Sequence, residues 1–324
     1  MSLVENLLRS HLPPLKPTPQ GWLTMNCPMC VHNGQPRPDT RHRGGIRFDD
    51  GQTAYHCFNC NYTTGWRPGS RLGFRMVKLM RVLNVDEGEI QRLKIQLWDQ
   101  VTEDVAAEPV VFKRDWPRYE LPWPVTGDIT EEADQYLRSR GVRDLAPWLM
   151  VAEPTVGMNN RIILPYTYGD DVVGYSARLI GDAAENKNMP KIMSHRPAAY
   201  VFNMDQQSRR RKYTIVVEGE YDALSIGGVA IMTNSIHPDQ ASVIEELDTE
   251  PVVLADRDAS GRRMVEQALQ FGWSVSFPDW PEGIKDANDA TRAFGRVAAL
   301  QTVLSAVESS PLKIKLLMRR WFNV

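Results

Sequence analysis

Two short apolar runs that end in acidic residues constrain the fold of this chain most strongly. Ile215-Val216-Val217 leads into Glu218-Gly219, and Val252-Val253-Leu254-Ala255 leads into Asp256-Arg257-Asp258. A helical pattern follows the Gly-containing turn in both places. This order is typical of an α/β domain with a parallel sheet, where ligands bind at the C-terminal edge of the strands. We therefore expect these acids to lie at one sheet edge.

A third acidic motif follows in Lys285-Asp286-Ala287-Asn288-Asp289. Asp256 and Asp258 are two residues apart, so an extended backbone would aim both at the same side. Clustered carboxylates repel one another unless a cation holds them, and hard oxygen ligands suit Mg²⁺ or Mn²⁺. The pattern predicts a site that handles phosphates through divalent ions. Its expected ligands are Glu218, Asp256, Asp258 and Asp286, with Asp222 and Asp289 as outer ligands.

The four cysteines form two C-x-x-C pairs, Cys27-Pro28-Met29-Cys30 and Cys57-Phe58-Asn59-Cys60, with 26 residues between the pairs. Two such hairpins predict a closed tetrahedral site for a structural Zn²⁺. A redox disulfide would need only one pair, and the chain has no further cysteine for a disulfide framework. His56 could replace a cysteine, but four complete ligands make that unnecessary.

Short alternating segments at Gly45-Ile46-Arg47-Phe48 and Thr53-Ala54-Tyr55-His56 are expected to be small strands of a zinc ribbon. Arg47, Phe48, Tyr55, Phe58 and Tyr62 interleave charge with aromatic rings around the cysteines. Such a surface can stack unpaired bases and hold phosphates. The alternative is that the rings pack a small core around the zinc, and different rings can serve the two purposes.

The length of 324 residues and a hydrophobic content of 42% are ordinary for a soluble protein of two or three domains. The net charge of −2 conceals basic clusters at 37–81, 209–212 and 313–320, which suit a polyanionic partner. No apolar stretch is long enough to span a bilayer, and residues 1–20 lack the features of a signal peptide. Together with reduced cysteines, these features predict a cytoplasmic protein.

The sequence predicts three main segments. Residues 1–70 are expected to form an N-terminal helix and the zinc ribbon, and residues 71–125 a helical and Pro-rich linker. Residues 126–324 are expected to form one larger domain. Within it, a helix at 130–141 and a hairpin at 161–178 precede the acidic motifs, and the expected subdivisions are 126–211, 212–295 and a C-terminal helix at 296–324.

The order of these features resembles the DnaG-like DNA primases. The shared features are the four-Cys ribbon, the linker, the basic hairpin and the patterns E-G, D-x-D and K-D-x-x-[DE]. The acidic domain resembles a TOPRIM domain. Because no fused helicase is recognisable, the chain is most similar to the stand-alone primases of T-even-type bacteriophages. The implied fold is multidomain, with a small β zinc ribbon followed by an α/β RNA polymerase domain that has a TOPRIM parallel-sheet core.

The resemblance implies an enzyme that synthesises short RNA primers on a single-stranded DNA template for lagging-strand replication. The acids at 218, 222, 256, 258 and 286 match metal positions of the family, which use two or more Mg²⁺ or Mn²⁺ ions. Arg161, Arg178 and Lys191 are the residues expected to bind the nucleotide. The implied partners are ribonucleoside triphosphates, the RNA primer, a hexameric replicative helicase and a single-strand-binding protein, with no membrane association. In the host cell, a viral protein would act in the cytoplasm.

Two features depart from the cellular family. All four zinc positions are cysteines, whereas bacterial relatives often use a histidine. A C-terminal helicase-binding domain is not recognisable, so a helicase contact is expected to use another surface.

Other classes remain open. A TOPRIM nuclease or topoisomerase is the alternative enzyme, although the chain has little room for topoisomerase gate domains and no P-loop motif. A RecR-like recombination mediator also combines a four-Cys zinc site with TOPRIM, but it does not need a complete acid set. A zinc-bearing adaptor that recruits helicase is the other non-enzymatic alternative.

Overall fold

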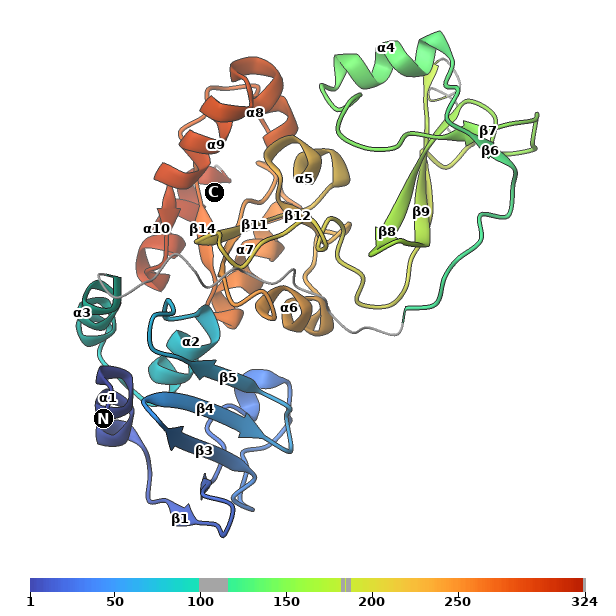
Figure 1. The fold of residues 1–324 in the computed structure, drawn as a ribbon. Coiled ribbons are helices and arrows are strands. Elements are labelled where there is room, and N and C mark those ends of the chain that lie inside the picture. Colours follow the sequence, from blue (N-terminus) through green and yellow to red (C-terminus); the bar gives the residue numbers. More distant parts are fainter. Residues whose placement is uncertain (99–115, 182–183, 185–187, 323–324) are drawn as a thin grey trace. The chain divides into compact units, whose positions relative to one another are not determined.

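The computed structural model describes residues 1–98, 116–181, 184 and 188–322 (Figure 1). The chain divides into two compact units. The first unit contains Met1–Glu108 and Glu245–Glu250, and the second contains Pro109–Ile244 and Pro251–Val324. In the described part of the chain, no helix combines the length and apolar composition needed to cross a membrane.

The first unit begins with helix α1 (Leu3–His11), whose Ser2 cap accepts a hydrogen bond from the Glu5 N–H. An antiparallel sheet follows in the strand order β1-β2-β3-β4-β5. Its strands are β1 (Lys16–Pro17), β2 (Leu23–Met25), β3 (Gly44–Asp49), β4 (Gln52–Cys57) and β5 (Thr63–Trp66), and a short 3-10 helix covers Val31–Asn33. Strands β3 and β4 confirm the two predicted ribbon strands.

Two helices then complete the first unit, α2 (Phe74–Val82) and α3 (Glu87–Trp98). Their apolar side chains, among them Met76, Leu79 and Leu93, are buried in the same core as the four cysteines and α1. The assignment of these residues to a linker was wrong, because their apolar faces pack against the ribbon instead of facing solvent. The remainder of the predicted linker up to residue 115 lies outside the described residues.

The second unit begins with an α+β part that supports a long hairpin. Helix α4 (Glu131–Ser139) starts at the Thr130 cap, and β6 (Val125–Thr126) pairs with β7 (Met150–Val151). Strands β8 (Arg161–Tyr168) and β9 (Asp171–Leu179) form the hairpin, and β10 (Ile192–His195) pairs with β9. The predicted helix at 130–141 and hairpin at 161–178 are therefore present.

The rest of the second unit is a five-stranded sheet in the order β12-β11-β13-β14-β15. Strand pairs β11–β12 and β13–β14 are parallel, and β15 is antiparallel to β14. Its elements are β11 (Tyr213–Val217), α5 (Glu220–Ile226), β12 (Val229–Ala230), α6 (Pro238–Glu245), β13 (Glu250–Val253), α7 (Gly261–Phe271), β14 (Ser274–Ser276), α8 (Ala287–Phe294), α9 (Arg296–Ser305), β15 (Val307–Glu308) and α10 (Pro311–Trp321). The parallel core of the second unit and the small β ribbon of the first unit confirm the predicted fold class.

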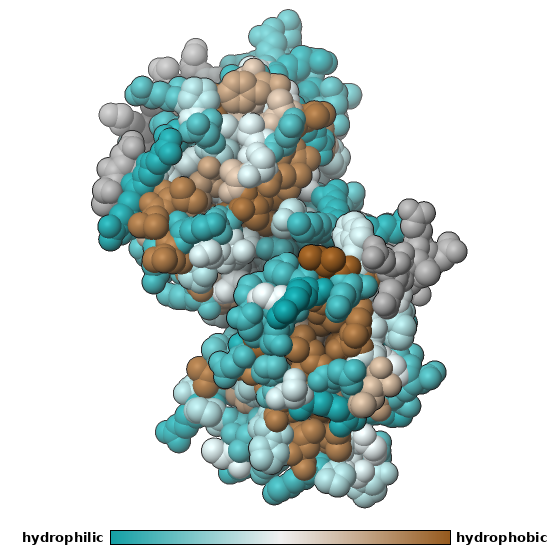
Figure 2. Space-filling model, turned by 90° about the vertical axis from the view of Figure 1, so that its left-hand side faces the viewer, coloured by the Kyte–Doolittle hydropathy of each residue, from teal (hydrophilic) through white to brown (hydrophobic). Residues whose placement is uncertain are grey.

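The C-terminal segment contains more than the single helix expected for 296–324. Helices α9 and α10 flank strand β15, and Ala299, Val303 and Trp321 enter the core of the second unit. Exposed apolar side chains remain on both helices, such as Val297 at 82% and Leu312 at 69%. Figure 2 shows apolar areas of this kind interspersed among hydrophilic side chains on the face that it displays.

Candidate active site and zinc site

The C-terminal ends of β11 and β13 place their acids side by side. The Leu254 N–H donates to the Val216 carbonyl at 2.9 Å, which sets the two strands in register. Glu218 follows β11 directly, and its carboxylate accepts a hydrogen bond from the backbone N–H of Asp256. A Cβ on Gly261 would lie 2.3 Å from the Asp256 carbonyl oxygen, so only glycine allows α7 to begin this close to the acids.

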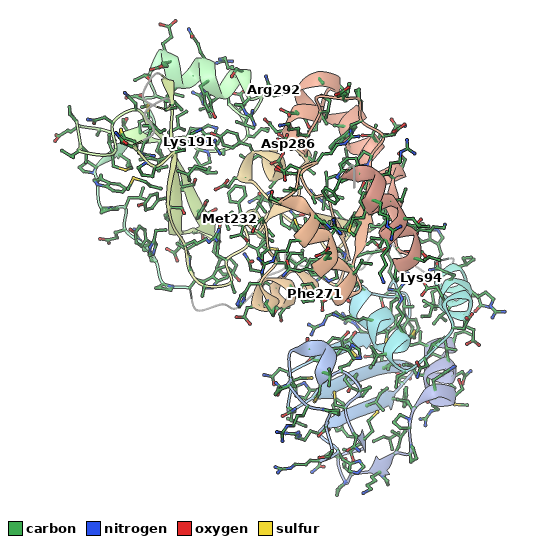
Figure 3. All side chains as sticks on the ribbon, turned by 180° about the vertical axis from the view of Figure 1, so that it is seen from behind. Lys94, Lys191, Met232, Phe271, Asp286 and Arg292 are labelled. Carbon is green, nitrogen blue, oxygen red and sulfur yellow. The ribbon has the colours of Figure 1, made fainter. Side chains whose placement is uncertain are left out.

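Asp286 and Asp222 reach the same edge from two helices. The Arg257 N–H donates to the Lys285 carbonyl at 2.8 Å, which brings the segment before α8 beside Asp256. Asp286 caps α8 by accepting the Asp289 N–H at 2.7 Å, and Figure 3 shows it at the start of that helix. Asp222, on α5, accepts the Asn288 N–H at 2.8 Å and interacts with Asp286.

The pKa values show how strongly these carboxylates interact. Burial raises the pKa of Asp256 to about 9, and repulsion from Asp222, Glu218, Asp286 and Asp258 adds to this effect. Burial followed by repulsion from Asp258 raises the pKa of Glu218 to about 7. Burial followed by repulsion from Asp286 raises the pKa of Asp222 to about 8. Five acids from three segments of the sequence therefore share one electrostatic environment.

Asp258 differs from its neighbours. Burial would raise its pKa, but hydrogen bonds from the Ser260 hydroxyl and from the Ser260 and Gly261 N–H groups lower it. The Ser260 hydroxyl lies 2.6 Å from Asp258 Oδ1. Asp258 is therefore held as an ionised carboxylate at the exposed side of the acidic cluster.

The donor set of this acidic cluster fits hard divalent cations. Glu218 Oε1 is buried and has no hydrogen-bond partner among the described residues, and carboxylate oxygens are the ligands that Mg²⁺ prefers. Burial and then mutual repulsion raise the pKa values of these acids, and a bound cation would offset both effects. Within the described ranges, the four cysteines are the only group of three or more acidic, His or Cys side chains arranged to hold one ion. The carboxylates of the acidic cluster lie around a wider region, and they do not converge on one common position for an ion.

The repulsion predicts how stability depends on pH without added divalent ions. Acids whose pKa is higher in the folded state stabilise the fold below their unfolded values, near pH 4, and this stabilisation is lost as pH rises through about 7 to 9. Thermal unfolding of the second unit should therefore occur at a lower temperature at pH 9 than at pH 6, and Asp256→Asn should reduce the difference. Calorimetry would detect the change, and equal unfolding temperatures would contradict it.

Two arginines converge on one ring beside the acidic cluster. The guanidinium carbon of Arg178, on β9, lies 4.9 Å from the centre of the Tyr221 ring, and that of Arg140 lies 5.7 Å from it. Tyr221 directly precedes Asp222. Arg140 Nε is buried and has no hydrogen-bond partner in the part of the chain that the structure describes. Each guanidinium lies against a ring that adjoins the acidic cluster, and Arg140 keeps a free buried donor, so both are candidates for binding an anion.

Arg140 was missed as a site residue because its helix gave only a fold signal. Its carbonyl accepts the Asn288 side-chain N–H at 2.8 Å, so α4 ends against the segment that carries Asp286. The sequence predicted a helix at 130–141, but nothing in the spacing placed its end near the acids.

Arg161 was predicted to bind the nucleotide, and the structure contradicts this role. Its side chain is fully buried and donates to the carbonyls of Gly157, Ala177, Pro190 and Lys191. Four of the five guanidinium donors are committed to carbonyls and the side chain is closed off from solvent, so Arg161 holds the hairpin to the 157 and 190 segments and is not available to a phosphate.

Two further predicted residues are Lys191 and Asp289. Lys191 is exposed, precedes β10 and lies over the separate β8–β9–β10 sheet (Figure 3). Asp289 lies in the first turn of α8 and pairs with Arg292 at 3.5 Å, so its carboxylate already has a cationic partner. The role of Lys191 at the nucleotide and that of Asp289 as an outer metal ligand stay predictions.

The four cysteines converge in the first unit. Their Sγ atoms all lie within 4.8 Å of one another, and the Cys27–Cys60 and Cys30–Cys57 separations are both 3.9 Å. A tetrahedral Zn²⁺ with Zn–S bonds of about 2.3 Å requires sulfurs about 3.8 Å apart, so the donor set fits this ion. The His56 ring is hydrogen-bonded to Thr63 Oγ1 at 2.9 Å, and His56 does not belong to the group of four cysteines.

The aromatic residues around the zinc site divide into two groups. Tyr55 and Tyr62 are 1% and 0% exposed, so they are core residues and cannot stack on bases. Phe48 is partly buried under the Arg9 guanidinium, which lies 4.3 Å from its ring. Phe58 is 81% exposed and contacts His56 edge-on. Of the five residues in the expected stacking surface, Phe58 is the ring that is free to receive a base.

No model of a known protein family matches the sequence, and no curated protein matches it. Several solved structures are similar to this one. The zinc-binding and RNA polymerase domains of the Aquifex aeolicus primase match at 16% identity over 100% of this chain and 98% of that chain, with a TM-score of 0.44.

Two further matches cover part of the chain. The RNA polymerase domain of the Mycobacterium tuberculosis primase DnaG, in complex with a double-stranded DNA oligomer with a 6-nucleotide overhang, matches at 17% identity over 59% of this chain and 75% of that chain, with a TM-score of 0.42. A DNA primase domain from Pseudomonas aeruginosa matches at 18% identity over 53% of this chain and 60% of that chain, with a TM-score of 0.36.

Proposed function

We propose that this protein is a DNA primase that joins ribonucleotides on a single-stranded DNA template. The observation that carries this proposal is the acidic cluster, in which Glu218, Asp222, Asp256, Asp258 and Asp286 share one sheet edge. The motifs that resemble DnaG-like primases supply the same acids. A complete carboxylate set favours a reaction at phosphate over the passive clamping of DNA by a mediator.

The acidic cluster would hold Mg²⁺ or Mn²⁺ through Glu218, Asp256, Asp258 and Asp286. Bound divalent ions would neutralise the triphosphate and stabilise charge on the attacking and leaving oxygens. Asp222 is buried and bonded to the α8 segment, so it positions Asp286. Glu218 has a buried oxygen without a hydrogen-bond partner among the described residues, and this carboxylate would accept the proton of the attacking hydroxyl.

In this reaction, a primer 3′-hydroxyl oxygen forms a bond to the α-phosphorus of the incoming nucleotide. The bond from that phosphorus to the pyrophosphate breaks, and the hydroxyl proton would pass to the Glu218 carboxylate. Arg178 and Arg140 lie beside the acids and would bind the negatively charged triphosphate. Orientation and electrostatic stabilisation, and not covalent catalysis, would supply the rate.

Arg178 and Arg161 provide a matched pair of variants. Arg178→Met should raise the KM for nucleotides by about 10-fold or more, because a hydrogen bond to a charged group contributes about 1.5–3 kcal/mol. Its unfolding temperature should stay near that of the wild type. Arg161→Met should instead destabilise the second unit by about 3 kcal/mol or more, since buried carbonyls left without donors cost about 1–3 kcal/mol each. Steady-state kinetics and thermal unfolding separate the two effects. A destabilised Arg178→Met protein together with a stable Arg161→Met protein of raised KM would refute both assignments.

The first unit would bind the template. Phe58 presents an open ring on the zinc-binding turn, and the basic residues of the 37–47 segment precede it in the sequence. Stacking on a ring tolerates any base, whereas contacts to base edges specify sequence. We infer that Phe58 stacks on an unpaired template base.

Phe58→Ala should weaken binding of single-stranded DNA roughly 10-fold, because stacking of one base contributes about 1–3 kcal/mol. Val31→Ala is the control, since Val31 is another apolar side chain of the zinc module and is 51% exposed. Fluorescence anisotropy with a labelled oligonucleotide measures both. Equal affinities for the two variants would remove Phe58 from the template surface.

The function itself is tested by incubating the protein with single-stranded DNA, Mg²⁺ and ribonucleotides. New short RNA that requires the template supports a primase. Cleavage of the DNA would indicate a TOPRIM nuclease, and binding without chemistry would indicate a mediator or an adaptor. A hexameric replicative helicase and a single-strand-binding protein are the partners that we expect for this function, and addition of the helicase should increase the yield of primers.

A further inference from the structure

Three of the four zinc-site sulfurs receive a hydrogen bond from a neighbouring donor. The Tyr55 hydroxyl lies 3.0 Å from Cys27 Sγ, and the Asn59 side-chain nitrogen lies 3.2 Å from Cys30 Sγ. The Asn59 backbone N–H lies 3.4 Å from Cys57 Sγ. Tyr55 is buried on β4, so its hydroxyl cannot turn to solvent instead. These donors point at atoms that would carry negative charge in the zinc-bound site.

A chain of contacts fixes the orientation of Asn59. Arg43 Nη1 lies 2.5 Å from Asn59 Oδ1, and Arg43 Nε lies 2.9 Å from Asp39 Oδ1. A guanidinium can only donate, so the oxygen of Asn59 must face Arg43 and its NH₂ group must face Cys30. Asp39 has a fully buried side chain and also accepts the N–H groups of Cys27 and Arg43 at 2.9 and 2.8 Å.

Cys60 is the exception. Among the described residues, no tyrosine, amide or backbone N–H donates to its sulfur, whose contact at hydrogen-bonding distance is with the Cys27 sulfur at 3.9 Å. Asn33 lies close by but donates to the Cys60 carbonyl at 2.7 Å and not to the sulfur. Cys60 is also the most exposed of the four, at 7% against 4% or less for the others.

We propose that Tyr55 and the Asp39–Arg43–Asn59 chain control the chemical stability of the zinc site and leave Cys60 as its reactive ligand. A hydrogen bond disperses the negative charge of a thiolate, so a sulfur that accepts one is a weaker nucleophile. Tyr55, Asn59, Arg43 and Asp39 are positioning residues in this account, and they need not touch the template or the nucleotide. Outer partners of this kind change metal affinity by about 10–100-fold in other sites.

The proposal rests on the four-cysteine site and is independent of the polymerase reaction. In the zinc-loaded full chain, a limiting amount of iodoacetamide should alkylate Cys60 first. The thiolate sulfur forms a bond to carbon and iodide leaves, so zinc release follows modification. Peptide mass spectrometry locates the modified cysteine, and a chromogenic chelator follows the release of zinc.

Tyr55→Phe is the sharpest variant, because it removes one hydroxyl and leaves the ring in the core. It should add Cys27 to the early-modified sites and accelerate zinc release about 10-fold. Asn59→Ala should add Cys30 in the same way. Asn33→Ala is the matched control, since it removes an amide that bonds to a carbonyl, and its modification pattern should stay that of the wild type.

Each variant is first shown to hold one zinc per chain, so that changes in reactivity do not reflect unfolding. If Asn59→Ala fails this check, Tyr55→Phe alone decides the matter. Early alkylation of Cys27, Cys30 or Cys57 in the wild type would overturn the proposal. A Tyr55→Phe protein that reacts in the same order and at the same rate as the wild type would also overturn it.

Discussion

Asp256→Asn is expected to abolish primer synthesis while leaving the binding of single-stranded DNA unchanged. Asp256 interacts with the other four acids of the cluster, and its pKa is raised to about 9 by burial and by their repulsion. Replacing it by an amide keeps the shape of the side chain but removes the charge that divalent ions need. The loss of synthesis should exceed about 100-fold, the upper end of the effect of losing an outer partner of a metal ligand.

The control for this variant is Asp279→Asn, the same chemical change at a carboxylate that is 99% exposed. Primer extension with labelled ribonucleotides measures synthesis, and anisotropy measures DNA binding. The Asp279 variant should match the wild type in both assays. Synthesis by Asp256→Asn at more than a tenth of the wild-type rate would exclude the assigned role of Asp256.

Removal of the zinc is expected to unfold the first unit and spare the second. All four cysteines lie in the core of the first unit together with residues of α1, α2 and α3. Cys57→Ser removes a thiolate from the centre of this core, and structural zinc supplies about 10–16 kcal/mol in small zinc-binding domains. Zinc content should fall to background, and the thermal transition of the first unit should disappear while that of the second remains.

His56→Ala is the control for the zinc variant. His56 directly precedes Cys57 and could in principle replace a cysteine as ligand, but its ring is bonded to Thr63. The variant should keep one zinc per chain and both thermal transitions. Elemental analysis and differential scanning calorimetry measure the two properties. Retention of zinc by Cys57→Ser, or its loss from His56→Ala, would contradict the four-cysteine site.

The sequence predicted the parts of the site that depend on local pattern. The apolar runs before Glu218 and Asp256 form β11 and β13, and parallel strands bring their C-terminal ends to one edge. The C-x-x-C pairs likewise predicted the convergence of the four sulfurs. In both cases, the spacing along the chain determines the geometry, so a single sequence is sufficient.

The errors concern side chains whose surroundings come from distant segments. Arg161 looked like a free cation, but the carbonyls of residues 157, 177, 190 and 191 surround it in the folded chain. The sequence left open whether Tyr55 and Tyr62 stack on bases or pack a small core, and the structure places both in the core around the zinc site. The helices at 74–98 have apolar faces whose partners lie in the ribbon. Periodicity shows that a helix has an apolar face, but not which surface that face will cover.

The most direct test of the central claim is to locate Mn²⁺ by anomalous scattering in crystals of the protein soaked with manganese and a nucleotide. The account predicts Mn²⁺ at the edge formed by Glu218, Asp256, Asp258 and Asp286, with the triphosphate extending toward Arg178. Crystals of Asp256→Asn should show a weaker signal there. Manganese and nucleotide bound elsewhere, with this edge unoccupied in protein that still makes primers, would contradict the account.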